Sequence, residues 1–464
     1  MLIRRAEING RAGLDLRTID GRIAEIGPGL DPLSRESVLD AAEGALLPGL
    51  HDHHIHLFAL AAAQSSLRCG PPAVRNRSEL EIALREARGG DGWTRGIGYH
   101  ESVSGPLDRV ALDRAVPDRA VRIQHRSGAL WMLNSRAIDR VGLDAGADCE
   151  GVERDRRGRA TGRLFRLDDW LRERLGGSEL PSLFEVGRRL ASYGVTGLTD
   201  ATPGNASPEL KAFVAALERG ELPQRLVLMG RADLPEVDHA RLTRGALKLL
   251  LDESALPELV EFQGEIEKAH ADRRPVAVHC VTRTQLIFAL VAFAAAGALE
   301  GDRIEHASVV SPEGLALLER LPLTVVTQPG FVYERGDAYL REVDELDLPW
   351  LYRCRGLLEA AVPLGGGTDA PFGEPDPWLA MWTAVERRTC SGATLGAEEA
   401  LTPERALALF TSPADAPGAA PRRLAPGAIA DLCLIDRPWA AAREELRNEL
   451  VVAAIRGGEC IFRA

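Results

Sequence analysis

The chain has 464 residues, of which 45% are hydrophobic and 27% are charged, and its formal net charge is −12. These proportions are those of a soluble globular protein, and the length allows roughly two or three domains or a large (β/α) barrel with attachments. A negatively charged chain without a basic stripe disfavours nucleic acid and anionic membrane surfaces as partners. We therefore expect a small-molecule substrate, no nucleic-acid partner and no membrane partner.

Cysteine usage and the N-terminal segment indicate a reducing compartment. The seven cysteines are scattered singly, without a CxxC pair, so structural disulfides are not expected. Residues 2–6 have the pattern of a strand and lack the charged and apolar regions of a signal peptide. The longest apolar run, residues 286–299, is too short to span a bilayer, so it predicts a buried helix. These features predict a cytoplasmic protein.

Both ends of the chain have the pattern of β-structure. Residues 1–48 alternate between apolar and polar side chains, with turn signals at Asn9-Gly10 and Asp20-Gly21. Strand-like segments recur near the C-terminus, at residues 430–436 and 451–458. We therefore predict one small β-sandwich domain, built from residues 1–48 plus 411–464.

The middle of the chain alternates short apolar strands with helical stretches, which is typical of parallel strands joined by helices. The eight predicted strands lie at residues 50–56, 195–199, 225–229, 246–251, 276–280, 303–305, 323–327 and 362–366. They predict a (β/α)8 barrel formed by residues 49–64 plus 190–410. Residues 65–189 are too long for one connection and predict an inserted α/β subdomain. The predicted fold class is therefore α/β.

Five side chains with metal-ligand chemistry lie at the ends of these predicted strands. His54 and His56 are two residues apart on a strand, so their imidazoles would point the same way. His279 and His306 end two other strands, and Asp369 follows a run of three glycines. The C-terminal ends of barrel strands converge on one face, which would bring all five around one site. Each has an alternative, as a polar loop, a core histidine or a helix cap, but together they predict a metal site.

Lys248 is one of three lysines in the chain and lies in the apolar strand Ala246–Leu251. Burying an unpaired ammonium group is costly, so a lysine at this position suggests a chemical role. The alternatives are that its side chain reaches solvent or pairs with Asp252 or Glu253. His51 and His53 have the wrong phase to share a face with the neighbouring histidine pair.

Several motifs resemble one known family, and together they span nearly the whole chain. They are residues 47–56 (Leu-Pro-Gly-Leu-His-Asp-His-His-Ile-His), 133–138 (Leu-Asn-Ser-Arg-Ala-Ile), 194–200 (Gly-Val-Thr-Gly-Leu-Thr-Asp), 352–358 (Tyr-Arg-Cys-Arg-Gly-Leu-Leu) and 425–432 (Ala-Pro-Gly-Ala-Ile-Ala-Asp-Leu). The chain resembles the amidohydrolase superfamily. Within it, the chain is similar to the amidohydrolase-3 branch, which includes proteins like N-substituted formamide deformylase.

This resemblance implies a site for two divalent metal ions, usually zinc, at the mouth of the barrel. His54 and His56 would bind the more buried ion with Asp369. His279 and His306 would bind the second ion. Lys248 stands where such enzymes carry a lysine carboxylated by CO₂, which bridges both ions.

We expect hydrolysis of a C–N bond in an amide, formamide or cyclic ureide by a metal-bridging hydroxide, with Asp369 as general acid and base. A mononuclear aminohydrolase (deaminase) is an alternative, but such enzymes usually carry a glutamate shortly after the strand-5 histidine. Residues 280–284 hold no carboxylate. An ester or lactone hydrolase is a further alternative. A non-enzymatic scaffold is disfavoured, because relatives of that kind lose ligands and all six candidates are present.

The substrate-binding residues are predicted less directly. His125 lies in the predicted insertion, and Ala129 stands where this branch often has a histidine, so the resemblance does not fix the substrate. Arg355 either meets an anionic group of the substrate or pairs with an acidic neighbour. Tyr333, after the seventh strand, is a further candidate, with Arg335 beside it. The natural substrate, the metal and any homo-oligomer stay open.

Overall fold

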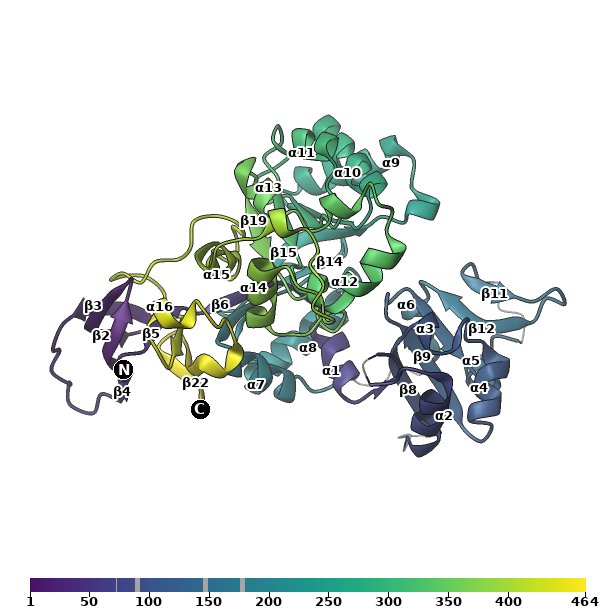
Figure 1. Cartoon of the computed structure of the whole chain (residues 1–464), viewed down its shortest axis with the longest axis horizontal. Coiled ribbons are helices and arrows are strands. Elements are labelled where there is room, and N and C mark those ends of the chain that lie inside the picture. Colours follow the sequence, from purple (N-terminus) through teal and green to yellow (C-terminus); the bar gives the residue numbers. More distant parts are fainter. Residues whose placement is uncertain (72, 88–91, 145–148, 176–179) are drawn as a thin grey trace. The chain divides into compact units, whose positions relative to one another are not determined.

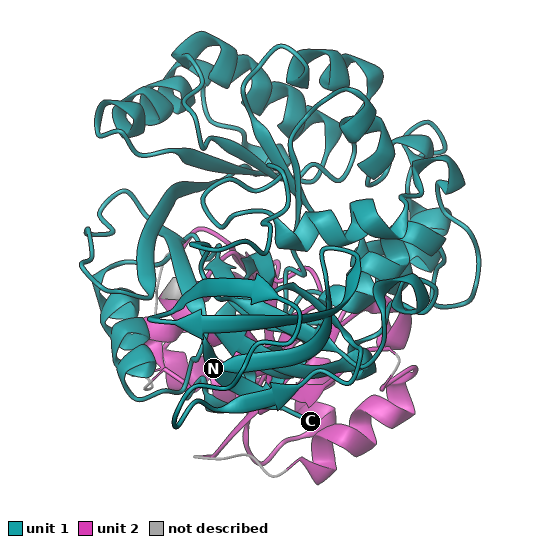
Figure 2. Cartoon of the chain, turned by 90° about the vertical axis from the view of Figure 1, so that its left-hand side faces the viewer, with its two compact units in different colours: residues 1–57, 182–464 teal, residues 58–181 magenta. Residues whose placement is uncertain are grey.

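The computed structural model describes residues 1–71, 73–87, 92–144, 149–175 and 180–464 (Figure 1). The chain forms two compact units. Unit 1 consists of residues 1–57 and 182–464, and unit 2 consists of residues 58–181 (Figure 2). Unit 2 is the counterpart of the predicted insertion at 65–189, with both borders displaced toward the N-terminus. The N-terminal border of unit 2 is not visible in the sequence, because residues 57–63 are uniformly apolar.

Unit 1 contains the eight predicted barrel strands, and all of them are parallel. Their order is β19-β18-β17-β16-β15-β14-β13-β6. Their bounds are β6 Leu50–Ile55, β13 Val195–Asp200, β14 Arg225–Gly230, β15 Leu242–Leu250, β16 Val276–Cys280, β17 Arg303–His306, β18 Thr324–Thr327 and β19 Leu364–Gly366. Just beyond β19, Asp369 N donates to His54 O (2.7 Å) and His56 N donates to Ala370 O (2.9 Å). These bonds join the last segment to the first strand, so the barrel is nearly closed.

Both faces of the barrel strands are covered, so even the polar side chains of β6 and β17 are buried. Every residue of β6, β13, β17 and β19 is buried. The predicted buried helix at 286–299 is α10, which begins at a capping box between Thr282 and Gln285. The helices of unit 1 that connect the strands are α7 Phe184–Ser192, α8 Ser207–Glu218, α9 Leu259–Ala271, α10 Arg283–Ala296, α11 Pro312–Leu318, α12 Gly330–Glu342, α13 Cys354–Glu359, α14 Pro377–Glu386 and α15 Pro403–Thr411.

Strands from both ends of the chain form one eight-stranded sheet, where the sequence predicted a β-sandwich. The order is β22-β21-β20-β5-β1-β2-β3, with β4 paired to β1. The bounds are β1 Leu2–Ile8, β2 Arg11–Ile19, β3 Arg22–Gly27, β4 Val38–Asp40, β5 Ala45–Pro48, β20 Leu432–Ile435, β21 Val451–Arg456 and β22 Glu459–Arg463. Ile3, Leu16, Leu432 and Ile455 share one buried cluster. Because β5 ends two residues before β6 begins, this sheet anchors the start of the barrel.

Unit 2 is a six-stranded sheet with a separate hydrophobic cluster on each face. The strand order is β11-β12-β10-β9-β8-β7. One cluster includes Val121, Ile123 and Met132, and the other includes Trp131 and Leu164. The bounds are α1 Leu57–Gln64, β7 Leu67–Arg68, α2 Arg77–Glu86, β8 Trp93–Tyr99, α3 Glu101–Ser104, α4 Arg109–Ala115, β9 Ala120–His125, β10 Leu130–Leu133, α5 Ser135–Val141, β11 Val152–Arg154, β12 Ala160–Phe165 and α6 Asp168–Arg174.

Among the residues that the structure describes, no helix has both the length and the apolar character needed to cross a bilayer.

The close approach of the turn after β19 to β6 depends on Gly367. A Cβ atom at this position would lie 2.6 Å from His54 Cβ and 2.8 Å from His54 N. We expect Gly367→Ala to lower the free energy of unfolding by about 1–3 kcal/mol, because the backbone has to move to remove the overlap. Chemical denaturation measures this loss. Gly264→Ala is the matched control, since nothing lies within 4 Å of the added methyl group in α9. Equal stability of the two variants would contradict this view of the turn.

Candidate metal centre

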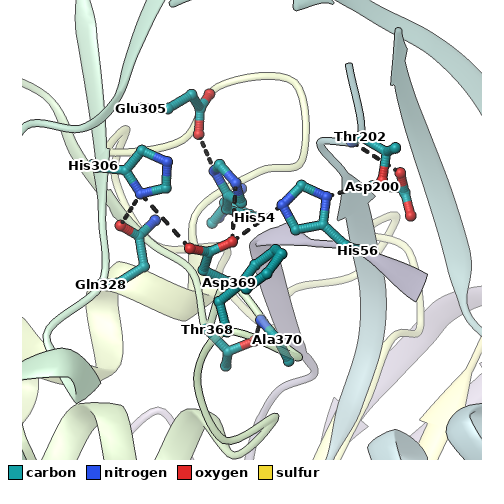
Figure 3. A network of polar contacts seen from close by, with 12 residues as sticks. His54, His56, Asp200, Thr202, Glu305, His306, Gln328, Thr368, Asp369 and Ala370 are labelled. Atoms are coloured by element: carbon teal, nitrogen blue, oxygen red, sulfur yellow. Dashed lines mark hydrogen bonds and ion pairs between the residues drawn. The ribbon is translucent and has the colours of Figure 1, made fainter. Parts of the chain in front are cut away.

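Three side chains, from the first strand of the barrel and from the turns after its first and last strands, converge at the C-terminal face (Figure 3). One ligand atom from each of His54, His56 and Asp369 lies within 4.8 Å of the others. His56 Nε2 is 3.1 Å from Asp369 Oδ1, and His54 Nε2 is 3.5 Å from the same oxygen. His306 reaches the other oxygen, with Nδ1 3.9 Å from Asp369 Oδ2. The sequence placed these residues together, and the structure brings them to one point.

Asp52 ties the end of β6 to the turn that carries Asp369. Its Oδ1 accepts the backbone N–H groups of His54 (3.1 Å) and Thr368 (3.0 Å), and its Oδ2 accepts the Thr368 hydroxyl (2.6 Å). Burial raises the pKa of Asp52 to about 7, although these hydrogen bonds act to lower it. The sequence motif contains this aspartate, but its role as a tie between two distant segments follows only from the structure.

Two residues of the site have a left-handed backbone that non-glycine residues rarely adopt. The φ angle is 55° at Asp369 and 70° at His306. Such conformations cost about 1–3 kcal/mol each, and at an active site the surrounding structure holds them in place. At His306 the turn also ends the alternation of β17, so Glu305 and His306 both lie beside His54 (Figure 3). The sequence predicted His306 and missed Glu305, since strand alternation would send neighbours to opposite faces.

Three histidines are oriented through Nδ1. His54 Nδ1 makes a short contact with Glu305 Oε2, His56 Nδ1 is 2.9 Å from Thr202 Oγ1, and His306 Nδ1 is 2.7 Å from Gln328 Oε1. Metal-binding histidines commonly use one ring nitrogen in this way, which leaves the other for the ion. Burial lowers the pKa of His54 to about 4 and that of His306 to about 3. Both imidazoles are therefore neutral at pH 7, as ligation requires.

Glu305 is the buried anion behind His54. Arg303 Nε makes a short ion pair with Glu305 Oε1, and Arg303 Nη2 donates to the backbone oxygen of His53 (2.7 Å). Burial raises the pKa of Glu305, but Arg303, Lys248 and His54 lower it, and the net direction is well below the usual value. Glu305 is thus ionised and can only accept hydrogen bonds, so His54 Nδ1–H is the donor in the contact between them.

His279 and Lys248 lie on neighbouring strands next to this cluster. The rings of His279 and His306 are 4.4 Å apart, and those of His54 and His306 are 4.7 Å apart. The strand register pairs Lys248 with Ala277, two residues before His279, so both side chains lie on the same face. The structure thus adds the remaining two predicted ligands to the same region of the barrel.

The Lys248 side chain is buried without a counter-ion. The residue is 4% exposed, so it does not reach solvent, and in the described part of the chain Nζ has neither a hydrogen bond nor an ion pair. The alternative pairing with Asp252 or Glu253 is therefore not seen. Burial lowers the pKa of Lys248 to about 8, although Glu305 acts to raise it. A sizeable fraction of the amine is therefore neutral near physiological pH.

The three residues predicted to bind substrate lie in different elements and have different partners. Arg355 lies in α13 with its side chain 57% exposed and forms an ion pair with Glu359 (2.7 Å), which is the alternative the sequence left open. Tyr333 in α12 packs edge-on against Trp382, 5.8 Å between centroids. His125 belongs to unit 2, where it contacts Glu101 (3.0 Å) and Ser127 (2.8 Å). Substrate contact by these three residues stays a prediction.

The comparison with known proteins decides the family. The sequence profile of the amidohydrolase family matches residues 37–462. The chain belongs to this family. It is 26% identical to N-substituted formamide deformylase of Arthrobacter pascens, over 92% of this chain and 91% of the relative.

Solved structures show the same fold as this amidohydrolase-family chain. A metal-dependent hydrolase of Pyrococcus horikoshii superposes with a TM-score of 0.73 at 21% identity, covering 96% of this chain and 98% of the other. A mutant of atrazine chlorohydrolase from Arthrobacter aurescens TC1, solved with zinc and atraton, gives a TM-score of 0.55 at 14% identity and covers 100% and 95%. These likenesses confirm the predicted (β/α)8 barrel.

The orienting role of Glu305 is testable through metal affinity. We expect Glu305→Gln to weaken zinc binding about 10- to 100-fold, because the neutral amide holds His54 less firmly and leaves Arg303 without its counter-charge. Competition with a chromogenic chelator measures the zinc dissociation constant. Glu313→Gln, at an exposed position in α11, is the control. A folded Glu305→Gln protein with unchanged zinc affinity would show that Glu305 does not support the site.

Proposed function

We propose that this chain is a metal-dependent hydrolase that cleaves a C–N bond of a small amide, formamide or cyclic ureide. The observation that carries the proposal is the convergence of His54, His56 and Asp369 at the C-terminal face of the barrel, with ligand atoms within 4.8 Å of one another. Membership of the amidohydrolase family and the activity in the name of the Arthrobacter pascens deformylase support this reaction class.

The chemistry of the donor atoms fits a bound cation. His54 Nδ1 carries the proton that faces Glu305, so the lone pair of His54 Nε2 faces Asp369 Oδ1 at 3.5 Å. A nitrogen lone pair and a carboxylate oxygen at this separation repel each other unless a positive charge lies between them. Neutral imidazole and carboxylate are also the donors that zinc prefers. The site therefore fits a divalent ion.

The residues divide into two ligand groups in this proposal. His54, His56 and Asp369 would hold one ion, and His279 and His306 would hold a second, with Lys248 between them. The zinc in the Arthrobacter aurescens chlorohydrolase supports zinc as the metal. Bound divalent ions would lower the pKa of a water molecule toward neutrality and polarise the scissile carbonyl group.

Lys248 would serve as an anion after reaction with CO₂. In this reaction the neutral amine would form an N–C bond to CO₂ as one C–O π bond opens, and the nitrogen would release one proton to water, so that a carbamate anion replaces the neutral amine. The lowered pKa of Lys248 supports this step, because the neutral amine is the nucleophile. Carboxylation also removes the cost of burying an unpaired cation, since the carbamate would lie against the metal ions.

Asp369 would move the proton during hydrolysis. Its Oδ1 lies next to His54 and His56, which leaves its carboxylate at the centre of the ligand cluster. From this position it can accept a proton from the attacking water and deliver it to the leaving nitrogen. An aminohydrolase reaction with a single ion is less well supported, because no carboxylate lies in the five residues after His279. Cys280 does not replace that acidic group, since burial raises the pKa of its thiol and keeps it neutral.

A substrate panel tests the proposed function. The protein is loaded with zinc in the presence of bicarbonate and offered N-acyl amino acids, N-formyl amines and cyclic ureides, with esters and lactones for comparison, and release of the products is measured. We expect turnover within these classes. Hydrolysis of esters or lactones alone, or no turnover of any compound by protein with bound zinc, would refute the proposal.

Asp369→Asn is expected to reduce turnover about 10²- to 10⁴-fold without unfolding the protein, because the amide cannot take up the proton. Steady-state kinetics on the best substrate of the panel, with circular dichroism as the folding check, measures this loss. Asp415→Asn, at an exposed position, is the matched control. Turnover equal to that of the wild type would remove Asp369 from proton transfer.

Lys248→Ala is expected to abolish activity, and short carboxylic acids such as acetate and propionate are expected to restore part of it by supplying the bridging carboxylate. The assay is turnover as a function of acid concentration at constant zinc. Lys268→Ala, at an exposed position in α9, should respond to neither change. A fully active Lys248→Ala protein that retains two zinc ions would contradict the bridging role.

A further inference from the structure

Arg335 places a guanidinium group at the same end of the barrel as the ligand cluster. It lies in α12, which begins just after β18, and its Nη2 donates to the backbone oxygen of Phe372 (2.6 Å). The ring of Phe372 in turn lies edge-on to His56, with 5.5 Å between the ring centroids. One residue, Phe372, therefore separates Arg335 from a predicted metal ligand.

The guanidinium group of Arg335 is fixed in position but has no counter-ion. Its carbon lies 3.9 Å from the centroid of the Phe331 ring, which holds the flat group by a cation–π contact. Within the described residues it forms no ion pair, and its one hydrogen bond is through Nη2. The Nε and Nη1 atoms are not buried. Two N–H-bearing nitrogens of a half-buried arginine thus stay accessible, and each can donate a charge-assisted hydrogen bond to a carboxylate oxygen.

Two tyrosine side chains also influence the charge of Arg335. Tyr339 and Tyr352 have their hydroxyl oxygens 3.1 Å apart, and Tyr352 N donates to Ser308 O (2.9 Å), close behind His306 in the chain. Burial lowers the pKa of Arg335, but the two phenol groups and Asp369 raise it, and the net direction is upward. The guanidinium group is therefore a permanent positive charge, and the hydroxyl groups behind it are already bonded to each other.

The nearest acidic neighbour on the same helix is already engaged. Glu334 Oε1 accepts the backbone N–H of Glu374 (2.9 Å), and burial raises the pKa of Glu334 to about 7. A carboxyl group that is partly protonated near neutral pH and bonded to the backbone neutralises Arg335 only weakly. The other acid nearby, Asp369, lies within the ligand cluster.

We propose that Arg335 binds a carboxylate group of the substrate, so that the preferred substrates are N-acyl or N-formyl compounds that carry a carboxylate, such as N-acylated amino acids. This inference rests on the proposed function. The sequence suggested an anionic substrate group for Arg355, but that side chain is exposed and paired with Glu359, whereas Arg335 lies beside the ligand cluster.

Two substrate pairs that differ only in the carboxylate test this inference. N-formylphenylalanine is compared with N-(2-phenylethyl)formamide, and N-acetylphenylalanine with N-(2-phenylethyl)acetamide, using zinc-loaded protein. We expect the wild type to prefer the acid of each pair. Arg335→Met should reduce the ratio of kcat/KM values, acid over neutral, about 10- to 100-fold, because a charged hydrogen-bonding partner is lost. Arg335→Lys should reduce it less, since the charge stays and the planar set of N–H donors is lost.

The ratio distinguishes binding of the carboxylate from a structural role, because damage to the loop at Phe372 would slow both members of a pair equally. Arg341→Met is the control, as Arg341 lies on the same helix with an exposed side chain, and its ratio should equal that of the wild type. Equal turnover of acid and neutral compounds by the wild type, or an unchanged ratio in Arg335→Met, would overturn the inference and leave the proposed function standing. If only cyclic ureides are cleaved, the inference again fails alone. If nothing in the panel is cleaved, both fail.

Discussion

The arrangement of the candidate site depends on how β6 is joined to the turn that follows β19. The two segments are more than three hundred residues apart in the sequence, and the barrel brings them side by side as its first and last strands. Backbone hydrogen bonds from Asp369 to His54 and from His56 to Ala370 complete the junction, and Asp52 reinforces it by accepting from both sides. The absence of a side chain at Gly367 lets the turn approach His54 closely enough for these bonds to form.

The electrostatics of the site follow from this closure. Once the barrel excludes water, every polar group inside needs a partner, and the partners form a chain from Arg303 through Glu305 to His54. That chain fixes which nitrogen of His54 carries the proton. It ends at two groups that the protein leaves without a full complement, the Asp369 carboxylate and the Lys248 amine. In the proposed function, bound metal ions would stabilise both of these groups.

The elements around the site differ in how strongly they are held. The barrel strands are held by backbone hydrogen bonds, and three imidazoles are held by side-chain contacts through Nδ1, which suits a reaction that needs its groups preorganised. Arg335 is held through one hydrogen bond and a ring contact at the edge of the cluster, where its charge can discriminate among substrates. In the proposed function, reaction and recognition would be assigned to different strands and helices of the same barrel, so that one could vary while the other is kept.

The sequence was sufficient for the barrel because hydrophobic periodicity and strand–helix alternation are local signals. It placed β16 at its observed bounds, and it identified His54, His56 and Asp369 because strand ends in a barrel converge. It took β15 to start at residue 246 instead of Leu242, because Arg244 and Gly245 interrupt the apolar pattern there. It could not decide whether Arg355 contacts the substrate or pairs with an acidic neighbour, since the ion pair with Glu359 is one of several that the sequence permits.

What the sequence by itself determined is therefore the set of strands and the residue types at their ends, because these depend on neighbours along the chain. Only the tertiary structure decided that Glu305 and not solvent faces His54, that Asp52 joins two distant segments, and that Arg335 lies near the ligands. Each of these depends on side chains from different strands or helices meeting in a low-dielectric interior. Their meeting is set by register and by local backbone turns such as the left-handed one at His306, which no pattern of residue types along the chain encodes.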